Sequence, residues 1–422
     1  MDVNALFARA ETAFAAGAHQ AARADLRRLV KLVGPHPAVL HLDALNEARS
    51  GAVVAARVAY ARAIAAAPRD PQLMNNYANF LADQGDHRGA LDQYGQALQH
   101  APAFHQARLN RAILLNRLNR PAEARSDADV LIQALPSDPA VRQTSGAIHL
   151  ALGDLGAAGA DFDAVLATNP ADLKALHGRA RVAMISGEEA LAIRLFRQAL
   201  ALTPGDPELL LGLAEALEAA GEADAVELLE ATVRGRPEWR DGHAALARMK
   251  AEQGAGDAFD AIWREALQQR PDDLPLALAH VGCLVSAARP HAALAALTPL
   301  VTRHGHSPEA DLYEATAAIG AGDQDRAAAA LARLGDSPAA LLPRGQLALL
   351  RGDPAAAAAD LEALTRDRPG DVLAWAYLDI AWRLLDDPRH AWLSGQPGLV
   401  AIQDIEYRGD WAQLTEVLRG LH

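Results

Sequence analysis

The stretch PQLMNNYANFLADQGDHRGALDQYGQALQHAP, residues 71–102, contains the pattern that decides the fold of this chain. Gly85 divides it into two segments of similar length. The second segment carries Ala90, Tyr94 and Ala97 on one helical face and ends at a proline. That proline recurs along the chain at steps of 33 or 34 residues, as Pro68, Pro102, Pro136, Pro170, Pro204, Pro237 and Pro271.

A repeated pair of helices explains this spacing. A unit of 34 residues holds two helices and two tight turns, and neither helix can bury its apolar side alone. Stacking of successive pairs supplies the missing partner surface, and small residues such as Ala78 and Ala112 let the helices approach closely. Glycine suits the left-handed residue that closes a helix. The expected turn glycines are Gly17, Gly51, Gly85, Gly153, Gly187, Gly221, Gly254, Gly322 and Gly352.

The second helix of each pair resembles that of the tetratricopeptide repeat, in which the pattern A-x3-F/Y-x2-A ends at a proline. The resemblance implies an all-α fold, a right-handed superhelical α-solenoid of about ten or eleven helix pairs with a C-terminal cap. It also implies a scaffold that binds a protein or an extended peptide segment in its concave groove. The motif residues include Ala56, Tyr60 and Ala63; Ala90, Tyr94 and Ala97; and Ala192, Phe196 and Ala199.

The regularity of the register divides the sequence into three parts. Residues 1–273 are expected to form the regular array. Residues 274–371 are expected to continue it less regularly, because Ala288 replaces a turn glycine and the following unit is short. Residues 372–422 are expected to form a capping helix and a C-terminal tail, since an open solenoid end would expose apolar surface.

Composition argues against several other classes of function. The formal net charge is -13, which provides no basic surface for nucleic acid or an anionic membrane. Cys283 is the only cysteine, which excludes an intrachain disulfide and any multi-cysteine zinc site. The N-terminal sequence does not resemble a secretion signal, and no stretch of eighteen apolar residues occurs. We therefore expect a cytoplasmic protein without a membrane segment, and the alanine and arginine usage is typical of bacteria.

The sequence offers no motif for catalysis or for metal binding. Its fifteen histidines are scattered and lack carboxylate or cysteine partners at metal-ligand spacing. His41 and Asp43 match an H-x-D pattern, but they fall in the first helix of a pair, where the facial geometry of an iron site is not expected. We expect no enzyme activity, no cofactor and no metal ion.

The tail resembles a junction found in another group of repeat proteins. The segment AWAYLDIAWRLLDDPRHAWLSGQPGLVAIQDI, residues 374–405, is similar to the sequence that joins tetratricopeptide repeats to a 2-oxoglutarate and iron(II)-dependent oxygenase domain in bacterial proteins. In those proteins the catalytic part would follow the position of Leu421, and its iron-binding motif has no counterpart here. The resemblance implies an alternative function, as the substrate-recognition region of such an oxygenase.

The concave groove is expected to be lined by positions 2, 5, 6, 9 and 12 of each first helix, as in the family. Asparagine is a poor helix former, so three asparagines within residues 75–79 indicate a role other than helicity. Amide side chains can hold the backbone of an extended peptide. The expected groove residues are Gln72, Asn75, Asn76, Asn79, Gln106, Asn110, Asn116, Arg117, Gln143, Lys174, His177 and Arg181.

Two alternatives stay open for these groove residues. The asparagines could instead bond neighbouring turns of the structure or remain solvated. Lys174 and Arg181 lie on one face of a helix and could meet an acidic segment, or form a solvated basic face. The identity of the partner and the oligomeric state cannot be predicted from the sequence.

Overall fold

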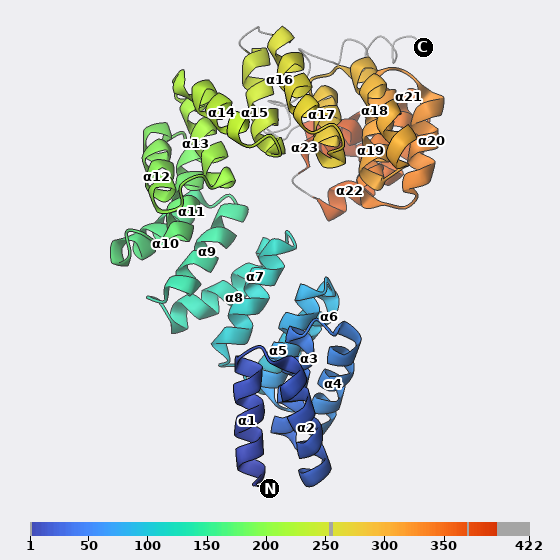
Figure 1. Ribbon diagram of the computed structural model, residues 1–422. Coiled ribbons are helices and arrows are strands. Elements are labelled where there is room, and N and C mark those ends of the chain that lie inside the picture. Colours follow the sequence, from blue (N-terminus) through green and yellow to red (C-terminus); the bar gives the residue numbers. More distant parts are fainter. Residues whose placement is uncertain (1, 253–255, 369–370, 395–422) are drawn as a thin grey trace. The chain divides into compact units, whose positions relative to one another are not determined.

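The computed structural model describes residues 2–252, 256–368 and 371–394, which form helices joined by short turns (Figure 1). Eleven helix pairs follow one another in these ranges, each made of a first and a second helix, and two further helices come after them. No strand occurs there. The predicted all-α class and the upper estimate of the number of pairs are therefore confirmed.

The first helices of the pairs are α1 (Val3–Ala15), α3 (Pro37–Arg49), α5 (Pro71–Asp83), α7 (His105–Arg117), α9 (Pro139–Ala151), α11 (Leu173–Ile185), α13 (Pro207–Ala219), α15 (Arg240–Glu252), α17 (Leu274–Ser286), α19 (Pro308–Gly320) and α21 (Leu341–Leu350). The second helices are α2 (His19–Val33), α4 (Val53–Ala66), α6 (His87–His100), α8 (Pro121–Ala134), α10 (Leu155–Thr168), α12 (Glu189–Leu202), α14 (Asp224–Gly235), α16 (Gly256–Gln269), α18 (Pro290–His304), α20 (Gln324–Leu334) and α22 (Pro354–Asp367). A short 3-10 helix, η1 (Pro338–Ala340), precedes α21, and α23 (Val372–Leu384) and α24 (Arg389–Ser394) follow the last pair.

Aspartate side chains fix the start of many helices. At the start of α5, Oδ1 of Asp70 accepts the backbone N–H groups of Gln72 and Leu73 at 2.9 and 3.1 Å, and a proline occupies the first helical position. This arrangement satisfies backbone donors that a helix end leaves unpaired, and proline lacks only an N–H that the helix does not use there. Asp138 and Asp206 cap α9 and α13 in the same way.

A residue with positive φ closes the first helix of almost every pair. Most of these residues are the expected glycines, although Gly254 lies outside the described residues. Asn119 and Ala288 take the same conformation at φ values of 56° and 52°, and Asp386 does so after α23 at 53°. Ala288 stands 34 residues before Gly322, which has a φ of 76°. The turn therefore keeps its place in the register even where alanine replaces glycine.

The helices form two compact units by their contacts, unit 1 (Met1–Ala225) and unit 2 (Val226–His422). Within unit 1, each first helix contacts the next first helix, and each second helix contacts the first helix of the following pair. The same two kinds of contact recur within unit 2 from α15 to α23. The division of the sequence at 273, which concerns the register of the repeats, stays a prediction.

An aromatic side chain of the second helix fills the space between two first helices. Phe162 of α10 lies so close to α9 and α11 that a Cβ atom at Gly146 or Gly178 would come within 2.9 or 2.4 Å of its Cζ atom. Phe196 of α12 has the same relation to Gly212 of α13, at 2.5 Å. Each buried ring therefore joins its own pair to the next one.

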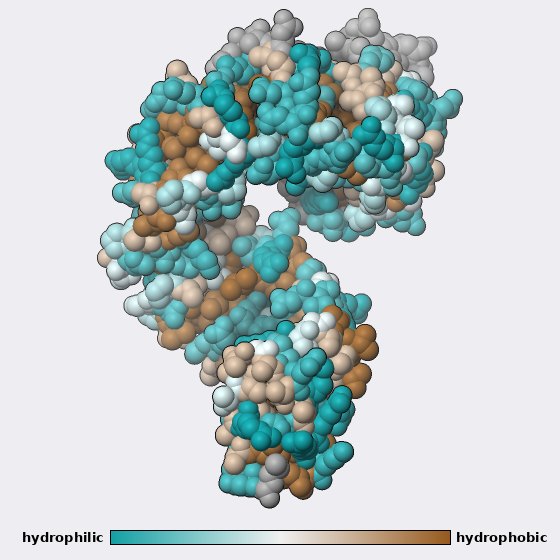
Figure 2. Space-filling model, in the orientation of Figure 1, coloured by the Kyte–Doolittle hydropathy of each residue, from teal (hydrophilic) through white to brown (hydrophobic). Residues whose placement is uncertain are grey.

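Some apolar side chains of unit 1 remain outside its core. Figure 2 shows hydrophobic areas among the hydrophilic side chains on the visible face of this unit. The large apolar side chains with the greatest exposure include Val54 and Val58 of α4 and Leu32 of α2. Scattered exposed apolar residues are usual on protein surfaces and indicate no site by themselves.

Replacement of Gly178 by alanine should destabilise the protein. The added methyl group would overlap the ring of Phe162, and such overpacking costs about 1–3 kcal/mol. Gly95 in the interior of α6 is a matched control, because a Cβ atom there would meet nothing within 4 Å, and Gly95→Ala should stabilise the helix by up to about 1 kcal/mol. Urea unfolding followed by circular dichroism measures both changes, and equal midpoints for the two variants would contradict the packing described here.

Replacement of Ala288 by glycine should stabilise unit 2. Left-handed backbone costs an L-residue about 1–2 kcal/mol, and part of this gain is offset by the greater freedom of glycine in the unfolded chain. Gly322→Ala should have the opposite effect, since Gly322 has the same conformation and open space around it. Thermal melting tests the pair of variants, and a lower melting temperature for Ala288→Gly would argue against a strained turn.

Candidate functional site

The candidate site of unit 1 is the row formed by the first helices α3, α5, α7, α9 and α11, here named the first-helix surface. Successive members of this row contact each other. Because the repeats share one register, equivalent side chains line up across the row. All the groove residues expected from the sequence lie on α5, α7, α9 and α11.

Two hydrogen bonds of the same kind join successive first helices. Nδ2 of Asn110 donates to Oδ1 of Asn75 at 3.0 Å, and Nδ2 of Asn76 lies 2.9 Å from Nε2 of His41. In both bonds the partners are 35 residues apart, so position five of one repeat is joined to position six of the next. Asn110 also donates to Oδ1 of Asn79 at 3.1 Å. These bonds tie α3 to α5 and α5 to α7.

The asparagines deepest in this network are engaged with each other. Asn75 is only 2% exposed. Oδ1 of Asn79 accepts the hydroxyl group of Tyr94, on α6, at 2.5 Å in addition to the bond from Asn110. Both N–H groups of Asn110 are therefore used toward α5. These amides connect helices, which is the first of the alternatives left open by the sequence.

Two glutamines form the exposed end of the same network. Nε2 of Gln72 donates to Oδ1 of Asn76 at 3.1 Å, and Nε2 of Gln106 donates to Oδ1 of Asn110 at 3.0 Å. Both glutamines are exposed. No hydrogen bond within the described ranges uses their carbonyl oxygens, so each offers an acceptor to a backbone N–H group.

Other polar side chains continue the row on α9 and α11. The hydroxyl group of Thr144 donates to a carbonyl of its own helix at 2.8 Å, so the amide network stops there. Nε2 of Gln143 donates at 2.8 Å to Oδ1 of Asp172, the residue that caps α11. Nε2 of His177 lies 3.6 Å from a carboxylate oxygen of Glu208. Gln143 thus contacts the cap of the next first helix, α11, and His177 contacts the next first helix, α13.

Positively charged side chains occupy the exposed part of the first-helix surface. Arg117 lies at the end of α7, and Lys174 and Arg181 lie on α11; all three are exposed. No ion pair in the part of the chain that the structure describes engages them. Asn116, beside Arg117, is half-buried, and its Oδ1 atom has no hydrogen-bond partner among those residues. The surface therefore combines uncharged amides with unpaired cations.

Burial lowers the pKa of both histidines in this row. For His41 the nearby charge of Asp70 opposes the shift. For His177 the charge of Glu208 opposes it and that of Arg181 adds to it. Both rings are therefore neutral near pH 7, and each can donate one hydrogen bond and accept another.

A set of buried carboxylates on the second helices was not predicted from the sequence. Asp127 of α8 is 2% exposed and accepts from Arg108 and Arg111 of α7 at 3.0 and 2.7 Å. Asp161 of α10 accepts from Arg142 of α9 at 2.6 Å. The signal is an arginine 16 or 19 residues before an aspartate, since Arg9 with Asp25 and Arg344 with Asp360 repeat the spacing of 16.

Models of the tetratricopeptide repeat match residues 78–139, 146–207 and 183–249 of this chain. The matched ranges contain the left-handed turns and the buried aromatic residues that link one pair to the next. The chain contains tetratricopeptide repeats. Repeats of this family typically act as non-catalytic scaffolds for protein interactions. No curated protein matches the sequence.

Solved structures similar to this tetratricopeptide-repeat protein have low sequence identity to it. Yeast Tom70 is 14% identical, with 91% of this chain and 96% of that chain covered and a TM-score of 0.47. PilW, a type IV pilus biogenesis factor, is 21% identical, covers 50% of this chain and 98% of its own, and has a TM-score of 0.46. A tetratricopeptide-repeat protein from Parabacteroides merdae is 14% identical, with 74% and 98% covered and a TM-score of 0.40.

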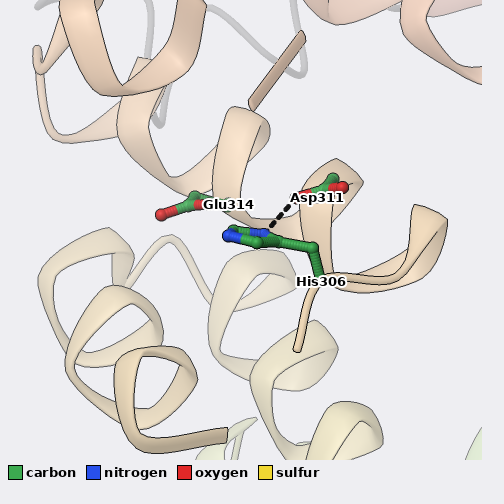
Figure 3. Close-up of side chains that lie close together, drawn as sticks. All are labelled: His306, Asp311 and Glu314. Carbon is green, nitrogen blue, oxygen red and sulfur yellow. Dashed lines mark hydrogen bonds and ion pairs between the residues drawn. The ribbon is translucent and has the colours of Figure 1, made fainter. Parts of the chain in front are cut away.

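Unit 2 of this tetratricopeptide-repeat protein contains a cluster with the composition of a metal site. His306, Asp311 and Glu314 bring one ligand atom each to within 4.8 Å of one another (Figure 3). However, Arg333 bonds to both carboxylates, and Arg326 donates to Glu314 at 2.7 Å. Two guanidinium groups therefore already balance the two carboxylates, and a cation would face positive charge. The cluster is an ion-pair network that joins α19 to α20, and the absence of a metal site stays a prediction.

Two sequence features that suggested oxygenase chemistry, the H-x-D pattern and the tail segment, lie outside this cluster. His41, of the H-x-D pattern, is bonded to Asn76 on the next first helix, and burial raises the pKa of Asp43. The tail segment 374–405 lies partly in α23 and α24, and its residues from 395 onward fall outside the described ranges. The family matches end before this segment. The resemblance of the tail to oxygenase-linked proteins remains a hypothesis.

In this tetratricopeptide-repeat protein none of the described helices combines the length and the apolar character that a membrane crossing requires.

Replacement of Asn110 by alanine should destabilise unit 1 of this repeat protein. The change removes the donors to Asn75 and Asn79, and an unpaired buried polar group costs about 1–3 kcal/mol. Gln106→Ala, one turn earlier on the exposed side of α7, should change stability by less than about 0.5 kcal/mol. Urea unfolding of the full chain compares them, and an equal loss from both changes would show that the amide network does not hold α5 to α7.

Proposed function

We propose that the first-helix surface of unit 1 binds an extended segment of a partner protein that carries acidic residues. The observation that carries the proposal is the alignment of exposed, unsatisfied polar groups along one row of helices. Gln72 and Gln106 offer free carbonyl oxygens on α5 and α7, and Lys174 and Arg181 offer unpaired cations on α11.

The two kinds of group would contact different parts of the partner. Amide oxygens accept backbone N–H groups and do not select particular side chains, so the α5 and α7 end would hold the segment by its main chain. Lys174 and Arg181 would meet carboxylates, even though the protein as a whole carries a net charge of -13. The acidic residues of the partner should therefore cluster at one end of the bound segment.

The spacing of the helices sets the length of the segment. Packed helices have axes about 8–10 Å apart, and an extended chain advances about 3.3 Å per residue. Three steps lead from α5 to α11, so a segment of about nine residues would span the row. Asn76 and Asn110 support the row from within, and variants at these positions would affect packing as well as binding.

The proposal can be tested by selecting random peptides of about ten residues against the full chain. We expect the selected peptides to be enriched in aspartate and glutamate and to bind less well as salt is added, because exposed ion pairs are screened. The double variant Lys174→Glu, Arg181→Glu should weaken their binding by about tenfold or more.

A matched control is available on the other helix of the same pair. Arg194 and Arg197 are exposed on α12, and reversing both charges changes the net charge by the same amount. This control variant should bind the selected peptides like the wild type. Equal weakening by the two double variants, or peptides without acidic enrichment, would contradict the proposal.

A further inference from the structure

Three helices of unit 2, α14, α15 and α16 (Figure 1), line a cavity with a volume of about 320 Å³. Half of the residues that line it are apolar, and they include Val233, Leu246, Ile262 and Ala266. One polar side chain of the wall, His243 of α15, is deeply buried, with 5% of its surface exposed. The volume lies at the lower end of the range for small-molecule sites.

The imidazole ring of His243 is unpaired within the part of the chain that the structure describes. Neither ring nitrogen bonds to any residue in the described ranges. Burial lowers the pKa of His243. The carbonyl group of Pro237 opposes this shift by favouring the protonated ring, but its effect is smaller and it falls outside hydrogen-bond geometry. The ring packs against Trp263, with centroids 5.9 Å apart. A neutral imidazole, packed against an indole ring, therefore carries an unused donor and an unused acceptor beside the cavity.

Comparison with the other repeats shows that this arrangement is unusual within the chain. His243 occupies position four of its repeat, which is a buried apolar residue in several others and an arginine in two. Where the residue is Arg108, the aspartate at position 23, Asp127, pairs with it. In the repeat of His243, position 23 is Ile262. In other repeats the buried apolar residues at position four include Leu40, Met74 and Leu176. The second arginine at this position, Arg142, pairs with Asp161.

The charges at the mouth of the cavity balance. Glu230 and Lys250 form an ion pair at 2.8 Å, and Arg234 and Glu265 are exposed beside it. Two positive and two negative side chains favour neither an anion nor a cation. The site is thus suited to a neutral ligand with a large apolar part.

We propose that this cavity binds a neutral aromatic group of one or two rings whose hydroxyl or N–H group forms a hydrogen bond with His243. A cavity of about 150 Å³ holds benzene, so about twice that volume suits a substituted phenol or an indole. Such a group can come from a free small molecule or from a tyrosine or tryptophan side chain of a partner protein. The site lies in unit 2 and does not depend on the binding surface proposed for unit 1.

Small aromatic probes test the proposal on the full chain. Calorimetry should detect saturable binding of 4-methylphenol and 3-methylindole, with 4-methylphenol binding about tenfold more tightly than toluene, which has the same shape without the hydroxyl group. N-acetyltyrosinamide distinguishes the sources: binding like that of 4-methylphenol indicates a tyrosine within a polypeptide, and its exclusion indicates a free small molecule.

Two variants and one control assign the effect to the cavity. His243→Leu introduces the residue of other repeats, so the fold should be kept while the preference for 4-methylphenol over toluene is lost. Ala261→Phe places a ring in the cavity and should abolish binding of all probes. His280→Leu is the control, because His280 stacks on Trp263 at 5.3 Å but lies outside the cavity wall, and it should leave binding unchanged.

A measurement on the wild-type protein keeps the test independent of the folding of the variants. In nitrogen-15 spectra of the histidine rings, 4-methylphenol should shift the ring signals of a single histidine. Absence of saturable binding, equal affinity for 4-methylphenol and toluene, or an unchanged preference in folded His243→Leu would each overturn the proposal.

Discussion

Each helix pair of this chain leaves apolar surface that only the next pair can cover, and the rest of the structure depends on that contact. Phe162 shows the constraint directly, because its ring lies between Gly146 of its own pair and Gly178 of the next, where neither backbone leaves room for a side chain. A shift of one residue in either first helix would place a larger side chain against the ring. The 34-residue register therefore has to be kept from pair to pair, and the stability of each pair depends on its contacts with neighbouring pairs.

The same register arranges the polar groups. Bonds between residues 35 apart recur at Asn75 with Asn110 and at His41 with Asn76, because each repeat presents the same positions to the next. The amide groups at these positions mostly form hydrogen bonds between helices, since a buried amide left unpaired would disfavour folding. Groups available to a partner are accordingly the outer ones, such as the carbonyl of Gln72 and the ammonium of Lys174.

Local chemistry made much of the fold predictable from the sequence. Proline at the start of α5, aspartate before it and glycine after it determine where that helix begins and ends, whatever its neighbours are. The partners of the asparagines were not predictable in this way, because periodicity tells which face a side chain is on and not how close the next helix comes. Asp127 was missed for a related reason, since a charged residue is assigned to the surface unless its two arginines are already known to converge on it.

In a repeat protein each position can be compared with the same position in the other repeats. A single unpaired side chain can therefore be recognised as an exception. Position four accepts leucine, or arginine when an aspartate faces it, and in the second case the aspartate pairs with the guanidinium group. His243 follows neither solution, because Ile262 stands where the aspartate would be. If the side chain only filled space, leucine would do so without the cost of an unpaired imidazole, which is about 1–3 kcal/mol. A hydrogen-bonding group from outside the chain would remove that cost, and the adjoining cavity has room for the ring that carries it.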